Sequence, residues 1–164
     1  MSTSDPGFQA ALEEAKQGDN EGGVPIGACL VSAQGTILGR GHNMRMQKDS
    51  AVIHVRQSLP TAHRRFLHLP LTHFKAEISV LEAAGRLPAS AYKGATVYTT
   101  LSPCDTCTGA CILYKISRVV IGENRTFVGG EDYLKSRGIE VVNLNSEECE
   151  ALMRSFIEKH PRDR

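Results

Sequence analysis

Two cysteines separated by two other residues carry the clearest chemical signal in the sequence. Cys104 and Cys107 lie in the run Pro103-Cys104-Asp105-Thr106-Cys107, between a strand pattern and a helix pattern. Thiolates at this spacing can reach one metal ion, and the N-terminus of a helix lowers their pKa. Two buried core cysteines or a redox pair are the alternative interpretations. We expect both cysteines to bind zinc.

A catalytic zinc site also needs a third protein ligand and one open position for water. Zinc deaminases combine H-x-E with a downstream P-C-x-x-C, and the glutamate moves protons without binding the metal. Here Glu77 begins a helix pattern, but Lys75 stands two residues before it. The matching histidine is His54, because removal of residues 55–75 would place it two residues before Glu77 and restore His-Ala-Glu.

The elements that must position these residues alternate between strands and helices. Hydrophobic periodicity and turn residues predict helices over 5–17, 77–87, 131–137 and 146–160, another helix after Pro103, and strands over 26–31, 36–41, 95–101, 118–122 and 138–144. Such alternation predicts an α/β sheet covered by helices on both faces. We find no repeat and expect one domain over residues 1–164.

Length and charge limit the class of protein. The chain has 164 residues, enough for one domain with a substantial core, and its net charge is +1. This balance gives no long-range attraction for nucleic acid or anionic lipid, so we expect neither as a partner. No apolar run approaches the about 20 residues of a membrane-spanning helix, and no signal-peptide pattern is visible. We therefore expect the cytoplasm, with the nucleus open as a second location.

Residues 55–75 do not fit the alternation of strands and helices. The segment contains four basic residues, no acidic residue, three of the six histidines, and two prolines. A stretch of this length without a clear element is unusual inside a compact domain. We therefore interpret it as an atypical insertion.

Six segments resemble one known family. They are GGVPIGACL (22–30), LGRGHNMR (38–45), EISVLEAAGRL (77–87), YTTLSPCDTCTGA (98–110), VVIGEN (119–124) and the strand of 138–142. Together they are similar to the fungal-type cytosine deaminases, within the zinc-dependent cytidine and deoxycytidylate deaminase superfamily. The resemblance covers nearly all of the chain outside 55–75.

The resemblance implies a fold and an activity. The fold is α/β, a three-layer α/β/α sandwich with a mixed central sheet of about five strands. The subunits form a homodimer, bind one Zn²⁺ each, and hydrolyse cytosine to uracil and ammonia in pyrimidine salvage. Zinc held by His54, Cys104 and Cys107 would activate a water. Glu77 would carry protons from that water to the ring and to the leaving amine.

The resemblance also implies a set of substrate-binding residues. Asn43 would hydrogen-bond the pyrimidine edge, near the Ala76 amide and the Ser102 carbonyl. Apolar walls would come from Ile26, Leu101 and Phe127. The residues alone favour simpler roles, such as a turn for Asn43, a loop anchor for Phe127, and core positions for the two aliphatic residues. We expect the remaining thiols, Cys29, Cys111 and Cys149, to be buried, with a supporting role near the metal left open for Cys111.

The segment 55–75 departs from the family, and we interpret it as a translated intron. Val55 requires a codon beginning GT, and Lys75 can be encoded by AAG, so the coding segment can open with GT and close with AG. The alternative is a true surface loop, whose closure costs only a few kcal/mol by chain-entropy scaling. In that case His73, four residues before Glu77, is an alternative zinc ligand.

A second departure concerns the C-terminal segment. The family continues FIEKHPRD with an aromatic residue and then an acid that cover the pocket, and this sequence has Arg164 at the aromatic position. The difference predicts weaker substrate binding and discrimination.

Two other functions stay open at this point. One is deamination of another nucleobase, such as a tRNA adenosine, which requires a basic tract for phosphates. The other is a zinc-binding deaminase relative that is catalytically impaired.

Overall fold

The computed structural model describes residues 1–46, 76–85 and 87–161. Six helices and five strands alternate along this part of the chain, in the order α1 (Pro6–Asn20), β1 (Gly27–Val31), β2 (Ile37–His42), α2 (Ala76–Ala83), α3 (Ala89–Tyr92), β3 (Thr96–Leu101), α4 (Asp105–Leu113), β4 (Arg118–Glu123), α5 (Glu131–Ser136), β5 (Glu140–Asn143) and α6 (Glu147–Lys159). The prediction of an α/β fold is confirmed.

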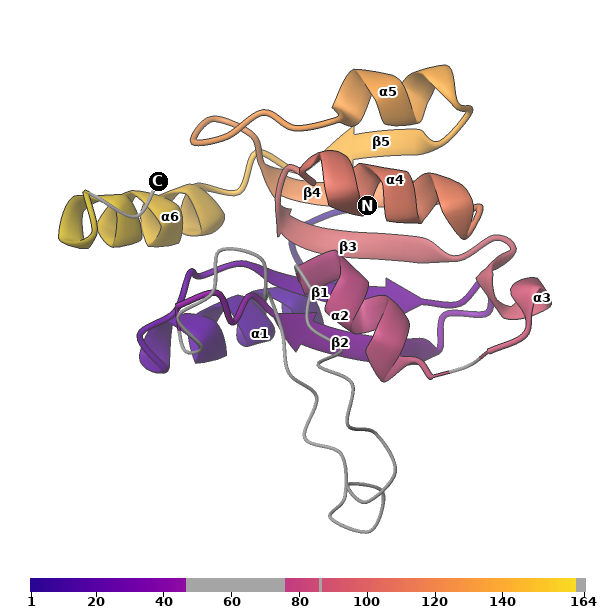
Figure 1. The fold of residues 1–164 in the computed structure, drawn as a ribbon, viewed down its shortest axis with the longest axis horizontal. Helices are drawn as coiled ribbons and strands as arrows, with labels where there is room; N and C mark the ends of the chain where they lie inside the picture. The colour runs from indigo at the N-terminus through magenta and orange to yellow at the C-terminus, as the bar shows by residue number, and fades with distance from the viewer. Residues whose placement is uncertain (47–75, 86, 162–164) are drawn as a thin grey trace, which may run out of the picture.

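The five strands form one mixed sheet in the order β2-β1-β3-β4-β5 (Figure 1). β1 pairs antiparallel with both β2 and β3, whereas β3–β4 and β4–β5 are parallel. The parallel pairs need crossover connections, which α4 and α5 supply. The carboxyl ends of β3 and β4 therefore lie at the same edge of the sheet.

Helices cover both faces of this sheet, as the three-layer prediction requires. Alternate residues of β1 divide between the faces: Ala28 and Leu30 pack in the cluster that includes α2 and α4, while Cys29 and Val31 pack in the cluster that includes α1. This is the period-two pattern of a strand buried on both sides. α1 and α6 lie on one face, and α2, α4 and α5 lie on the other (Figure 1).

The start of α1 and the start of α6 follow their sequence signals. The Asp5 side chain accepts a hydrogen bond from the Gly7 amide, with Pro6 at the first helical position. Ser146 caps α6 by accepting from the Cys149 amide at 3.3 Å. Both predicted helix starts are confirmed.

Two helix ends and one short helix differ from the sequence predictions. α1 continues to Asn20, three residues past the predicted end, and α2 ends at Ala83, four residues before it. Gly85 follows α2 with a φ of +78°, a conformation that terminates helices. The four residues of α3 were not predicted, because their pattern is too short to show periodicity.

The insertion at 55–75 and the histidines His54 and His73 lie outside the described residues. Among the residues that the structure describes, no helix is both long and apolar enough to span a membrane.

Candidate active site

A pocket of about 450 Å³ opens at the carboxyl end of β3. Its lining comes from the segment before β1, the end of β2, the starts of α2 and α4, the loop after β4, and α6. Ligand sites in α/β sheets commonly lie outside the carboxyl ends of strands. Nine of the ten site residues predicted from the sequence line this pocket: Ile26, Asn43, Ala76, Glu77, Leu101, Ser102, Cys104, Cys107 and Phe127.

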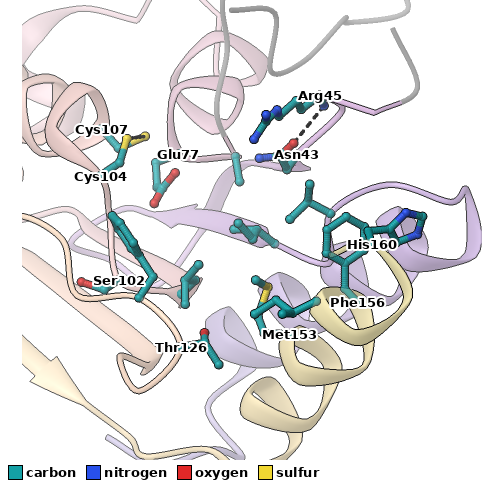
Figure 2. Close-up of a pocket in the computed structure, with 16 residues that line it drawn as sticks. Asn43, Arg45, Glu77, Ser102, Cys104, Cys107, Thr126, Met153, Phe156 and His160 are labelled. Atoms are coloured by element: carbon teal, nitrogen blue, oxygen red, sulfur yellow. Dashed lines mark hydrogen bonds between the residues drawn. The ribbon is translucent and has the colours of Figure 1, made fainter. Parts of the chain in front are cut away.

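The two cysteines of the C-x-x-C motif lie side by side at one end of the pocket (Figure 2). Cys104 is the N-cap of α4, and Cys107 is buried in its first turn, so the helix start brings both sulfurs together. The two Sγ atoms are 3.6 Å apart. Sulfurs that each lie about 2.3 Å from a tetrahedral zinc are about 3.8 Å apart, so this pair has the spacing of two zinc ligands.

The chemistry of this thiol pair also suits a cation. The hydrogen bond with Cys104 raises the pKa of Cys107 well above its usual range, and burial raises it further. The charges of Glu77 and Cys104 raise the pKa as well, so the thiol form of Cys107 is favoured unless a divalent cation is bound, which would stabilise the thiolate. Two sulfur donors 3.6 Å apart fit zinc. Within the described part of the chain, no group of three or more His, Cys, Asp or Glu residues forms a complete metal site.

Glu77 lies next to the cysteines, at the start of α2 (Figure 2). Its side chain is buried, and the Thr99 hydroxyl donates to its Oε1 at 3.2 Å. Burial raises the pKa of Glu77, and a hydrogen bond with Cys107 opposes this shift. A buried carboxyl group beside two candidate metal ligands is placed to exchange protons with a substrate in the pocket.

Asn43 lies at the end of β2 on the same pocket. Its backbone amide donates to the Ile26 carbonyl at 2.8 Å, and its Oδ1 accepts from the Arg45 amide at 2.9 Å. Asn43 therefore shapes a turn, as the simpler interpretation holds, and also lines the pocket. The apolar walls combine buried Leu101 with Phe127, which is 44% exposed.

Sequence reasoning missed the part of the pocket that α6 supplies. Met153, Phe156, Ile157 and His160 line it, and the Phe156 and His160 rings stack with centroids 4.5 Å apart. Figure 2 shows Phe156 and His160 opposite the cysteines. Their spacing of three and four residues was visible, but an apolar stripe on a helix is the same whether it covers a core or a pocket.

Comparison with known proteins identifies the family. Residues 1–123 match the family model described as the cytidine and deoxycytidylate deaminase zinc-binding region. The chain belongs to this family. It is 48% identical over 157 residues to a cytosine deaminase of Candida albicans, across 96% of this chain and 91% of the relative. A tRNA-specific adenosine deaminase of Bacillus subtilis is 34% identical over 116 residues, across 70% of this chain and 58% of the relative.

Solved structures of two deaminases share the fold. A guanine deaminase from Nitrosomonas europaea superposes with a TM-score of 0.61 at 19% identity, over 95% of this chain and 85% of its own. A deaminase of the tRNA wobble adenosine gives a TM-score of 0.58 at 24% identity, over 84% and 95%. The predicted mixed five-stranded sheet of the cytidine deaminase fold is confirmed.

Proposed function

We propose that this protein hydrolyses cytosine to uracil and ammonia. The observation that carries the proposal is the placement of the Glu77 carboxyl beside the Cys104 and Cys107 sulfurs, at the end of a pocket with apolar walls. The close similarity to a cytosine deaminase over almost the whole chain supports this substrate.

His54, Cys104 and Cys107 would hold one zinc ion per subunit, with His54 proposed from the sequence pattern. Bound zinc supplies Lewis acidity that lowers the pKa of a water toward neutrality. The Glu77 carboxylate would accept one proton of the water as the water oxygen bonds to C4, and would pass that proton to the ring nitrogen beside C4. Glu77 would then take the remaining hydroxyl proton from the oxygen on C4 and deliver it to the amino group, so that the C4–N bond breaks, ammonia leaves and the C4 carbonyl of uracil forms.

The substrate would lie flat between the apolar walls. Ile26, Leu101 and Phe127 pack against the ring faces, which favours a planar aromatic base. Asn43, the Ala76 amide and the Ser102 carbonyl line the same cavity and would hydrogen-bond the edge of the ring. Hydrogen bonds to a buried edge give stronger discrimination between bases than apolar contact does.

An ultraviolet assay of cytosine loss with zinc-loaded protein tests the substrate. Cytosine should be consumed with release of one ammonia per uracil. A tRNA wobble adenosine, tested in parallel, should be left unchanged because the net charge of +1 provides no strong attraction for phosphates. Turnover of the tRNA without turnover of cytosine would contradict the proposal.

We propose that residues 1–164 form a single deaminase domain. We also propose that the segment 55–75 is a translated intron, because removal of this segment restores His-Ala-Glu. A chain that lacks 55–75 should therefore bind zinc fully and deaminate cytosine faster than the full chain. The genomic and transcript sequences at the two junctions provide a separate test. Because every valine codon begins with GT, the end of the segment decides: a Lys75 codon of AAA instead of AAG would rule out an intron with these boundaries.

We also propose that the protein acts as a cytoplasmic homodimer in pyrimidine salvage. α4, α5 and the loop before α5 expose a set of large apolar side chains, Leu113, Tyr114, Val128 and Tyr133, which we term the α4–α5 patch. Large apolar side chains left exposed on two neighbouring helices are candidates for a protein interface.

A further inference from the structure

The loop of residues 124–130, which we term the pocket loop, connects β4 to α5 and carries one wall of the pocket. Thr126 and Phe127 of this loop line the cavity, yet Phe127 is 44% exposed. Its ring therefore has little packing of its own to fix it. The position of this wall depends on how the two ends of the loop are held.

A buried carboxylate anchors each end of the pocket loop. Glu123, the last residue of β4, accepts from the Arg125 and Thr126 amides at 2.6 and 3.0 Å and from the Thr126 hydroxyl. Glu131, the first residue of α5, accepts from the Asn124 side chain at 3.0 Å. Glu123 is 1% exposed and Glu131 is 8% exposed.

Ser102 joins this loop to the segment that carries the cysteines. Its hydroxyl donates to Glu131 Oε1 at 2.8 Å and accepts from the Gly129 amide at 2.9 Å. The Gly130 amide donates to the Pro103 carbonyl at 2.9 Å. The hydroxyl of Ser102 points away from the pocket (Figure 2), so this link uses a different part of the residue from the carbonyl proposed to meet the substrate.

The glycines of the loop permit this close docking. A Cβ on Gly129 would overlap the Pro103 carbonyl, and one on Gly130 would overlap the Thr108 side chain. The loop therefore lies directly against the turn between β3 and α4, where Cys104 begins the helix. The hydrogen bonds of Ser102 with Glu131 and Gly129, together with that between Gly130 and Pro103, thus hold the loop that carries Phe127 against the turn that carries Cys104.

We propose that Ser102 and Glu131, through their side chains, are positioning residues that set the affinity for the pyrimidine ring. The inference rests on the proposed function. Phe127 contacts the ring in the ground state and the transition state alike, so a displaced wall weakens binding without changing the chemical step. The Glu77 carboxyl is carried by α2, and the two sulfurs by the first turn of α4, which keeps its own hydrogen bond from the Thr108 amide to the Cys104 carbonyl when the link is removed.

Steady-state kinetics with cytosine tests the proposal. Ser102→Ala and Glu131→Ala each remove two hydrogen bonds of the pocket loop, and each should raise KM about tenfold and change kcat by less than about threefold. Glu131→Gln retains the accepting oxygen and should restore KM to within about threefold of wild type. Asp132→Ala removes the neighbouring acidic residue of the same first turn, which is exposed and pairs with Lys135, and should leave KM unchanged.

Zinc content and amide exchange separate this inference from the proposed function. Zinc content should be equal in all variants, and exchange of the pocket-loop amides, Gly129 above all, should become faster in Ser102→Ala. If Ser102→Ala lowers kcat and zinc content at constant KM, the link is merely structural and the inference is overturned. If the wild-type protein leaves cytosine unchanged, the proposed function fails. In that case amide exchange alone tests the link: pocket-loop amides that exchange at the same rate in Ser102→Ala as in wild type would overturn it.

Discussion

At the scale of single residues, His42 shows how a side chain outside the pocket supports one inside it. Its Nδ1 lies 2.8 Å from Glu14 Oε2 and its Nε2 lies 3.1 Å from Glu21 Oε2, so the ring joins the end of β2 to α1. Arg40 also pairs with Glu14, at 3.1 Å. Asn43, which lines the pocket, follows His42 directly.

The hydrogen bond with Glu14 raises the pKa of His42 against the opposing effect of burial, and Glu21 raises it further. The stabilisation is therefore fully present below the pKa of the unfolded state and is lost as pH rises through the folded pKa. His42→Gln should lower the free energy of unfolding by about 1 to 2 kcal/mol at about pH 6 and by less at about pH 9. Urea unfolding at both pH values measures this difference.

Glu13→Gln is the matched control for His42→Gln. Glu13 lies on α1 beside Glu14 and bonds Arg40 at 3.1 Å instead of the imidazole. Its effect on the free energy of unfolding should be the same at both pH values. An equal cost of His42→Gln at both pH values would mean that the ring acts by packing alone.

The same scale shows which site residues the sequence could predict. Cys104 and Cys107 were predictable because their spacing is local and one helix start positions both. Glu77 was predictable from the combination of H-x-E with the downstream P-C-x-x-C, although the two motifs lie at the starts of different helices, α2 and α4. The link between Ser102 and Glu131 was not predictable, because 29 residues separate the partners and only the folded loop brings them together.

At the scale of elements, close backbone packing positions the helix that carries Glu77. A Cβ on Gly39 of β2 would lie 2.6 Å from the Val80 carbonyl oxygen and 2.8 Å from the Ala84 amide, both backbone atoms. α2 therefore lies directly on β2. Gly39→Ala should force the two elements apart, lower the free energy of unfolding by about 1 to 3 kcal/mol, and displace Glu77.

Thermal unfolding of Gly39→Ala beside Gly109→Ala tests this packing. Gly109 lies in α4 with open space around it, so alanine there should leave the melting temperature unchanged or raise it. A Gly39→Ala protein as stable as wild type would show that α2 can move away from the sheet without loss.

Element types were predictable from periodicity, whereas their ends were decided by tertiary context. α2 ends at Ala83 because Gly85 adopts a positive φ before Pro88, although the hydrophobic pattern continues to Leu87. The helix over 146–160 was predicted, but the cavity that it helps to line was not. Met153 and Phe156 contact both the pocket and a hydrophobic core cluster. The periodicity of a single helix cannot show whether its apolar residues line a pocket or pack in a core.

At the scale of the whole molecule, the α4–α5 patch bears on assembly. Leu113 is 76% exposed, which is unusual for a side chain with so large an apolar area. Leu113→Glu should convert the proposed dimer to a monomer in light scattering coupled to gel filtration. Ile37→Glu provides the control, because Ile37 is an exposed apolar residue on β2 at the opposite edge of the sheet. Monomeric wild-type protein, or an equal effect of both variants, would contradict the proposed interface.

The central claim is that Glu77 moves the protons of a zinc-dependent deamination, and Glu77→Gln tests it most directly. Glutamine keeps the size of the side chain and can still accept from Thr99, so the variant should fold and retain the zinc content of wild type. Its kcat for cytosine should fall by about 100-fold or more, the usual contribution of general acid–base catalysis. Turnover of cytosine at the wild-type rate by the zinc-loaded variant would contradict the account.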